Sequence, residues 1–363
     1  MKILPKPTES KDAPSPFAIQ PLGERQLPQV SRLLTNVFGP GMLPAFVDPL
    51  FLRWKFFEPF PGWDTHRSYI IEQDDDIVAH ACLWPSVFQC SSSAEVRCSH
   101  ILDWAASPSA KGSGVTIYRH LMGLTEASFV VGGSDQAQRL LPRLGFKVQG
   151  TQRLYARVIR PWAQFRSRQI SSPPREVGRL LRNTFWSLGA KTPPAEWSAQ
   201  PAATAKEELD RLTSRWQPRS YCSARRSAAL VNYLLRCPIA KTAFYVINRA
   251  GVSAGYFILN KIGGQCRIID VFLGSEDREA WRSAYALIVQ TAAAMEGVCE
   301  VVATASLPWL GEVLQSLGFR LRQEKPIYLY DPEKRFAGLP PLLIQMVDSD
   351  AFFLHDPSYP YLT

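Results

Sequence analysis

A short glycine-bearing segment, residues 108–115, has the residue types and spacing that could bind a phosphate. It reads Pro-Ser-Ala-Lys-Gly-Ser-Gly-Val, follows an apolar run and precedes a helical pattern. Glycines let the backbone turn tightly, and successive N–H groups at a helix N-terminus form a positive concavity that suits an anion. Lys111 adds a full positive charge. The segment therefore predicts a site for a phosphate-bearing ligand, against the alternative of an ordinary turn or helix cap.

The elements that position this segment follow from the spacing of apolar residues. Residues 100–106 are typical of a strand, and residues 113–124 of a helix that starts within the glycine segment. The same patterns predict the other elements of the first half: a strand at 17–22, a helix over 27–38, a hairpin of 69–72 and 77–84, a strand at 128–131, a helix over 135–144 and a strand at 153–157.

The second half repeats the first at low similarity. Residues 244–247 and 252–259 echo the first hairpin, and Leu-Gly-Phe within residues 314–321 echoes the same triplet within residues 141–148. The matching positions lie about 175 residues apart, which indicates two copies of one domain. At 363 residues, the chain is long enough for two domains of about 150 residues each.

The glycine segment resembles the acyl-CoA loop of the GNAT superfamily of acyl-CoA-dependent N-acyltransferases, which has the pattern P-x-x-[R/Q]-G-x-G-[I/V]-[G/A]. The matching residues are Pro108, Lys111, Gly112, Gly114 and Val115, with Lys in place of Arg or Gln. Thr116 stands where the family has a small residue, and the order of strands over residues 17–157 fits the family.

The family's downstream segment has the pattern N-x-x-A-x-x-x-Y-x-x-x-G-F. The corresponding residues of this chain are Ser134, Ala137, Leu141, Gly145 and Phe146. In many GNAT enzymes its tyrosine gives a proton to the leaving thiolate, so the usual acid is missing here. The second half has the strand pattern and the Leu-Gly-Phe ending of the family, but residues 272–277 lack the glycine-rich loop.

The resemblance implies an α+β protein of three layers, in which two tandem GNAT-like domains each contain a mixed, mostly antiparallel sheet flanked by helices. The expected regions are a flexible arm (1–16), a GNAT-like domain with the acyl-CoA loop (17–159), a basic, proline-rich linker (160–206), a degenerate GNAT-like domain (207–335) and a C-terminal tail packed on the domains (336–363).

The resemblance also implies a donor site for acetyl-CoA, or another acyl-CoA, as co-substrate. Backbone groups at the strand end would pair with the pantetheine amides, and N–H groups of the loop would hold the pyrophosphate. The residues expected in these roles are Ala105, Ala106, Ser107, Lys111, Gly112, Ser113, Gly114, Val115 and Thr116.

Two residues of the strand before the loop are candidates for the base that deprotonates an amine acceptor. His100 titrates near neutrality in its ordinary state, and Asp103 lies beside the donor loop. Strand alternation predicts that His100 and Asp103 point to opposite faces. For each, the alternative is a purely structural role, which is also what we expect of His80 and His120.

Composition limits the remaining choices. The chain is 46% hydrophobic and has no uninterrupted apolar run of about 18 residues, so neither global disorder nor a membrane span is expected. The start of the chain has no signal peptide, which favours a cytoplasmic protein. The odd number of cysteines without a C-x-x-C pair argues against a disulfide framework and a metal site: Cys82, Cys90, Cys98, Cys222, Cys237, Cys266 and Cys299.

A net charge of +9 favours an anionic partner, and the linker contains a basic helix over residues 175–188. This helix either packs on a domain or makes a peripheral contact with a membrane surface. No specific nucleic acid is expected.

The leading hypothesis is acetyl transfer to the amine of a small molecule or amino sugar. Residues 52–55 and 346–353 look like tandem-GNAT proteins of bacteria, some of which accompany polysaccharide biosynthesis. One alternative is a FemABX-like transferase that uses aminoacyl-tRNA, and another is an acyl-CoA-binding or interaction module without catalysis.

Overall fold

The computed structural model describes residues 17–39, 44–90, 95–167, 173–189, 191–353 and 361–363. The arm predicted for residues 1–16 lies outside the described residues, as do residues 354–360 of the predicted tail. The first half contains β1 (Ile19–Pro21), η1 (Glu24–Gln26), α1 (Leu27–Phe38), η2 (Pro44–Val47), α2 (Pro49–Phe56), β2 (Ser68–Gln73), β3 (Asp76–Gln89), β4 (Glu95–Ala106), α3 (Ser113–Met122), β5 (Ala127–Val131), α4 (Asp135–Leu140), η3 (Leu141–Leu144) and β6 (Lys147–Val158).

Two helices, α5 (Pro161–Arg166) and α6 (Pro173–Ser187), connect the halves. The second half contains β7 (Trp197–Ala202), α7 (Glu207–Ser214), β8 (Cys222–Ala224), α8 (Ala228–Leu235), β9 (Thr242–Arg249), β10 (Val252–Ile262), β11 (Gln265–Leu273), α9 (Arg278–Ala294), β12 (Glu300–Ala305), α10 (Pro308–Ser316), β13 (Arg320–Tyr330), β14 (Leu342–Leu343), η4 (Met346–Asp348) and η5 (Asp350–Phe352). The β9–β10 hairpin and helix α6 confirm the elements predicted at these positions.

The strands of the described chain form one sheet in the order β1-β2-β3-β4-β5-β13-β6-β12-β11-β10-β9-β7, with β8 and β14 off this path. From β3 to β6 and from β10 to β13, the halves follow the same order of strands and helices. The last strand of each half is exchanged. Strand β13 pairs with β5, where Ile327 lies opposite Val131, and β6 pairs with β12, where Ala156 lies opposite Val302.

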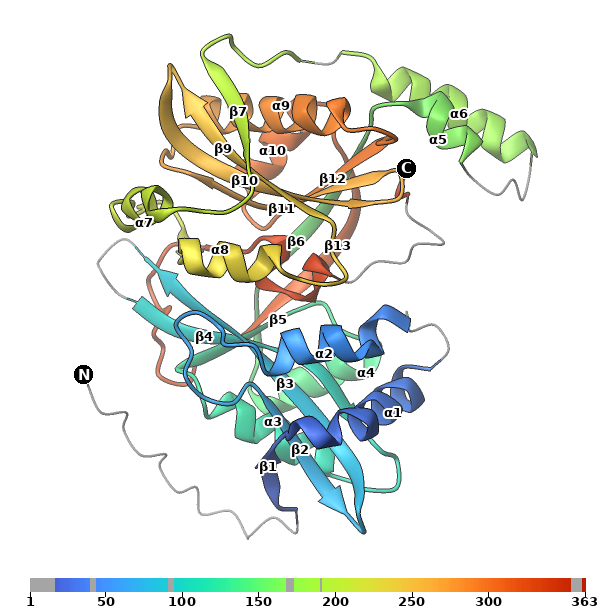
Figure 1. Cartoon of the computed structure of the whole chain (residues 1–363), viewed down its shortest axis with the longest axis vertical. Coiled ribbons are helices and arrows are strands. Elements are labelled where there is room, and N and C mark those ends of the chain that lie inside the picture. The colour runs from blue at the N-terminus through green and yellow to red at the C-terminus, as the bar shows by residue number, and fades with distance from the viewer. Residues whose placement is uncertain (1–16, 40–43, 91–94, 168–172, 190, 354–360) are drawn as a thin grey trace.

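Helices cover both faces of this sheet (Figure 1). Helices α1 and α2 pack on the face that carries Leu102, whereas α3 packs on the opposite face, which carries Ile101. In the second half, α9 and α10 cover Phe257 and Leu259. The predicted class, α+β with two mixed sheet halves flanked by helices, is confirmed. Within the predicted linker, β7 joins the sheet by pairing with β9.

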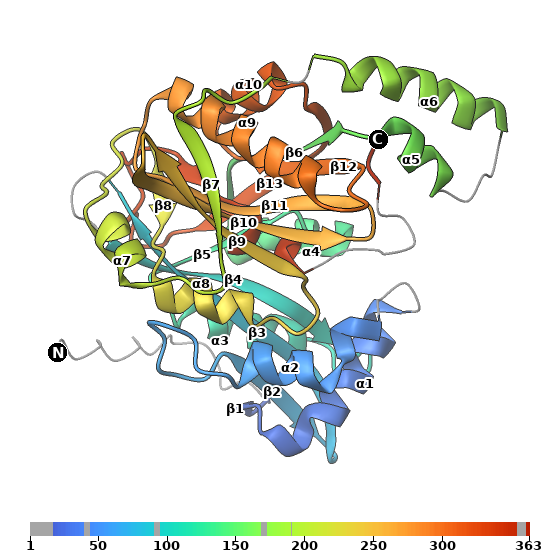
Figure 2. The ribbon, with the colours of Figure 1, turned by 45° about the horizontal axis from the view of Figure 1, so that its top comes forward.

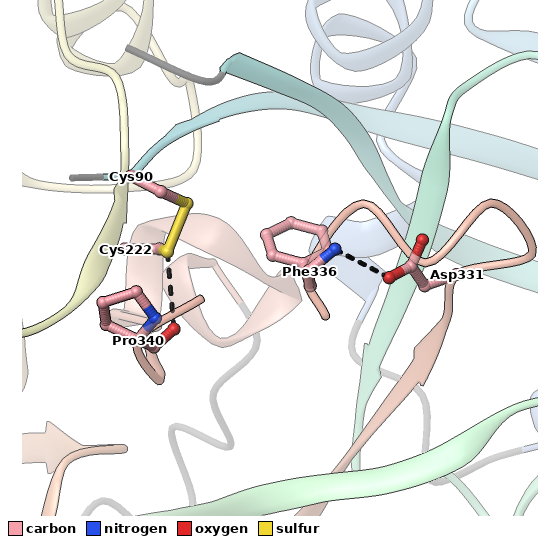
Figure 3. The surroundings of a disulfide bond; sticks show 5 residues. All are labelled: Cys90, Cys222, Asp331, Phe336 and Pro340. Carbon is pink, nitrogen blue, oxygen red and sulfur yellow. Dashed lines mark hydrogen bonds between the residues drawn. A yellow bond between two sulfur atoms is a disulfide. The ribbon is translucent and has the colours of Figure 1, made fainter. Parts of the chain in front are cut away.

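The cysteine prediction is wrong in one respect. Cys90 and Cys222 form a disulfide that joins the end of β3 to β8 in the other half of the chain (Figure 3). Parity and local spacing could not reveal the bond, because the two residues are 132 positions apart. The other five cysteines are buried free thiols, as expected of small core residues.

Helix length and polarity decide whether a segment could span a bilayer. Among the described residues, none of the helices is both long enough and apolar enough to do so.

Candidate functional site

A cleft of the first half opens where strands β4 and β5 separate. The two strands pair in parallel from Cys98, opposite Ala127, to His100, opposite Phe129, and the register ends there. Beyond this point lies a cleft of about 1650 Å³ that also extends along α1, α2, α3 and α4. Its walls include the glycine segment and two residues of the C-terminal tail, Asp350 and Phe353.

The glycine segment supplies donors at one end of this cleft. Within the described residues, the backbone N–H groups of Lys111, Gly112, Gly114 and Val115 donate to no acceptor. Helix α3 starts immediately after Gly112, so its partial positive charge adds to these donors. Lys111 is exposed beside them. Such donors suit an anion, which is the role that the sequence predicts for this segment.

The segment needs glycine at positions 112 and 114 for different physical reasons. Gly112 caps α3 with a φ of +92°, in the left-handed region that favours glycine. A Cβ at Gly114 would lie 2.9 Å from Cβ of Ala106 and 3.3 Å from Nε1 of Trp104. Trp104 also donates a 2.8 Å hydrogen bond to the carbonyl of Gly114. Gly114 therefore lets α3 approach β4 closely.

A β-bulge interrupts β4 where it enters the cleft. The register with β3 shifts between His80, opposite Ala105, and Cys82, opposite Leu102. Asp103, in the bulge, has a φ of +51°, a conformation that Asp adopts more readily than most residues. The bulge sends the side chain of Asp103 toward α2 and that of Trp104 toward α3.

Comparison with known proteins gives a structural likeness only. Neither a family model nor a curated protein matches the chain. A GCN5-related N-acetyltransferase from Anabaena variabilis ATCC 29413 superposes with a TM-score of 0.59 at 13% identity, covering 87% of this chain and 72% of its own. An N-myristoyltransferase from Saccharomyces cerevisiae, solved with bound myristoyl-CoA and inhibitors, gives 0.57 at 14% identity, covering 91% and 86%.

A third solved structure agrees with these two. A probable N-acyltransferase of unknown function from Enterococcus faecalis V583 gives a TM-score of 0.57 at 13% identity, covering 89% of this chain and 74% of its own. The chain has the GNAT fold. The fold therefore supports the family resemblance that the glycine segment indicates. The separation of β4 from β5 and the bulge in β4 lie in the half that carries this segment.

Within this GNAT fold, most of the predicted site residues line the one cleft. They are His100, Asp103, Ala106, Ser107, Lys111, Gly112, Gly114 and Val115. Three predicted residues do not line it. Ala105 and Ser113 are buried with 1% and 0% exposure, and Thr116 is half-buried on α3. The N–H of Ser107 already donates to the carbonyl of Val78, at 2.7 Å.

The predicted orientation of Asp103 is wrong. Regular alternation places Asp103 opposite His100, but the bulge reverses the alternation, and Asp103 meets Lys55 of α2. Lys55 Nζ lies 2.6 Å from Oδ2 of Asp103, and its side chain is only 2% exposed. Lys55 also lies 4.6 Å from the ring centroid of Phe353. A buried cation is thus held by one carboxylate and an aromatic ring.

His80 has the structural role that the sequence predicts. Burial lowers its pKa to about 4, so its ring is neutral at pH 7. Because the carbonyl of Asp103 can only accept, Nδ1 of His80 is the donor in their 3.2 Å contact. The hydroxyl of Ser68 then donates to Nε2, at 2.8 Å. His80 therefore fastens the bulge that directs Asp103.

His100 is a poor base in this site. Burial, and then the charge of Lys55, lower its pKa to about 3. The ring stacks on Phe129 with centroids 5.2 Å apart, and Nε2 accepts a long 3.4 Å contact from the N–H of Val131. Nδ1 is buried without a partner in the described residues. Because Nε2 accepts, the neutral ring carries its single proton on Nδ1, which can donate a hydrogen bond, but the ring does not take up a second proton at pH 7.

Sequence reasoning missed two polar residues of the cleft. Burial raises the pKa of Asp350, against the opposing charges of Lys55 and Lys325. Tyr118 of α3 also lines the cleft, and its ring centroid lies 4.3 Å from that of Trp104. Asp350 lies in the tail segment that already resembled tandem-GNAT proteins, which is the one signal that pointed to it.

The corresponding opening in the second half is filled by the chain itself. Strands β11 and β12 pair only as far as Arg267, opposite Val302. Beyond this point, the side-chain amide of Gln345 accepts from the N–H of Val271 at 2.8 Å and donates to its carbonyl at 3.0 Å. Helix α9 begins after two acidic residues, Glu276 and Asp277, which do not suit a phosphate.

Proposed function

We propose that the chain is an acyl-CoA-dependent N-acyltransferase whose first half binds the donor. The observation that carries this proposal is the set of unused N–H groups between Lys111 and Val115, placed at the opening between β4 and β5. These donors and the charge of Lys111 suit the pyrophosphate of CoA. The divergent strands leave an open strand edge along which an extended pantetheine arm fits.

The acyl group would then lie beside the bulge, where Asp103, His100 and Asp350 share one cleft. A bound acyl-CoA supplies a thioester whose thiolate can leave. The acceptor proposed here is an amine, because the carboxylates that line the cleft, including those of Asp103 and Asp350, favour a cationic substrate. The simplest donor is acetyl-CoA, although the size of the cleft admits longer acyl chains.

Asp350 is the strongest base candidate in this proposal. Its raised pKa makes its carboxylate a better proton acceptor than an ordinary aspartate, and it faces the same cleft as the donor loop. Asp103 is held in its ion pair with Lys55, so it is a weaker base candidate than Asp350. His100 would donate a hydrogen bond from Nδ1 without taking up a second proton.

Donor binding is tested by calorimetric titration with CoA and acetyl-CoA. We expect binding in the wild type and at least about 10-fold weaker binding in Lys111→Glu, because a negative charge would face the pyrophosphate. Lys147→Glu is the matched control, since Lys147 is also exposed but lies outside the cleft. Gly114→Glu is unsuitable, because even a Cβ there would strain the packing of α3 on β4.

Absence of binding in the folded wild type, or equal binding in Lys111→Glu, would contradict the donor site. Turnover is tested separately, by following release of the CoA thiol with a panel of primary amines and amino sugars. Binding of acyl-CoA without turnover of any amine would favour the non-catalytic module. Salt-sensitive binding of aminoacyl-tRNA without binding of CoA would favour the FemABX-like alternative.

A further inference from the structure

Helix α6 presents an apolar stripe to solvent. Four of its side chains recur at helical spacing and are strongly exposed: Val177 (50%), Leu181 (68%), Phe185 (71%) and, one residue beyond its end, Leu188 (68%). Offsets of four, four and three residues place them on one side of the helix. Figures 1 and 2 both show α6 lying beside α5 at the edge of the molecule, outside the sheet layers.

The inner face of α6 is polar, which is the reverse of an ordinary surface helix. Asn183, only 2% exposed, donates to Gln164 of α5 at 2.8 Å. Glu176 is 6% exposed and pairs with Arg179 at 2.7 Å. The helix therefore uses its hydrogen-bonding groups to attach itself to the protein, and its apolar side chains remain outside.

A stacked arrangement fixes this orientation. The indole ring of Trp186 lies 4.3 Å from the guanidinium of Arg182 on the same helix and 4.9 Å from that of Arg322 on β13. Cation–π contacts of this kind hold the C-terminal end of α6 against the sheet. Rotation of the helix to bury its apolar stripe would break these contacts together with the Asn183 hydrogen bond.

The charge around the stripe suggests what covers it. The one acidic residue among the described residues of α5 and α6 is Glu176, which pairs with Arg179. The same helices contain four basic residues: Arg166, Arg175, Arg179 and Arg182. Trp162 of α5 is also 54% exposed. Arginine beside an apolar stripe, with a nearby exposed tryptophan, is the composition of helices that lie in the interface of an anionic membrane.

A second copy of the chain is a poorer occupant. A stable protein interface needs about 20–30 residues on each side, whereas the stripe consists of four side chains. Facing arginines would also repel each other across a symmetric contact. A single interfacial helix, in contrast, is enough for reversible binding to lipid. We propose that the apolar stripe of α6 docks the protein on the surface of an anionic phospholipid membrane.

This proposal is independent of the proposed function and is tested by co-sedimentation with vesicles. We expect the wild-type protein to sediment with vesicles of phosphatidylcholine and phosphatidylserine, and to do so less with phosphatidylcholine alone or at high salt. The double variant Leu181→Ser, Phe185→Ser should bind at least about 10-fold more weakly, because it removes two of the four apolar side chains of the stripe.

The matched control is Val148→Ser with Val252→Ser, which removes two comparably exposed apolar side chains outside α6 and should bind like the wild type. Circular dichroism checks that both double variants keep the helical content. Equal sedimentation of the α6 variant and the wild type would overturn the proposal. Failure of the wild type to bind anionic vesicles would also overturn it. That outcome includes the case in which light scattering finds a dimer of the wild type but only a monomer of the α6 variant.

Discussion

The ion pair between Lys55 and Asp103 makes a specific prediction for the variant Asp103→Asn. Asn has the shape of Asp and tolerates the left-handed backbone of the bulge, so the substitution removes only the charge. Lys55, with a side chain only 2% exposed, would remain as a buried cation without its ion-pair partner, and only the electrostatic interaction with Asp350 would be left. Removal of one partner from a buried pair costs about 3–5 kcal/mol, and the 22% exposure of Asp103 places the expected loss near the lower value.

Thermal unfolding followed by tryptophan fluorescence measures this loss. A cost of about 3 kcal/mol corresponds to a fall in Tm of about 4 °C, because the entropy of unfolding is about 2.1 cal/mol/K for each of the 363 residues. Lys55→Met is the matching variant. It should cost less, because the remaining carboxylate of Asp103 reaches solvent and methionine suits the ring of Phe353. The double variant should therefore be more stable than Asp103→Asn alone. Additive losses, or a loss below about 1 kcal/mol in Asp103→Asn, would refute the reasoning.

Four further predictions follow from the same structure. Gly114→Ala should lower the free energy of unfolding by about 1–3 kcal/mol, because its Cβ would press on β4; an unchanged calorimetric Tm would contradict this. His80 and His100 have folded pKa values of about 4 and 3, below the ordinary 6.5, so the unfolded state binds more protons and stability should fall as the pH drops from about 6.5 toward 4. Urea titrations at several pH values would show no such slope if these rings were solvated. Reduction of the disulfide should lower stability by about 4 kcal/mol, and alkylation of the denatured, unreduced protein should label five thiols rather than seven. Asp350→Asn should reduce amine turnover by about 100-fold with unchanged affinity for CoA; in steady-state kinetics, a change in CoA affinity alone would exclude its role as a base.

The sequence was informative wherever the signal is local. The glycine segment, the strand before it and helix α3 lie next to one another in the chain, so backbone rules alone predicted a concavity lined by Lys111 and Gly112. The repeat of the hairpin pattern likewise predicted the order of strands in the second half.

What the sequence could not predict depends on contacts between distant residues. One bulge reverses the alternation of β4, so Asp103 faces Lys55, which no periodicity indicates. Asp350 enters the cleft from a tail that the chain adds after its last long strand. The filling of the second opening by Gln345, and the pairing of Cys90 with Cys222, are also products of tertiary packing.

The exchange of β6 and β13 has a consequence for synthesis of the protein. Strand β5 is complete at Val131, but its neighbour β13 does not begin until Arg320. During translation, the edge of β5 in the N-terminal half therefore stays unpaired until almost the whole chain has left the ribosome. In this state, strands of other chains can pair with that edge. A gene divided between the halves would yield two fragments that each lack an internal strand, and only their co-expression would restore the continuous sheet.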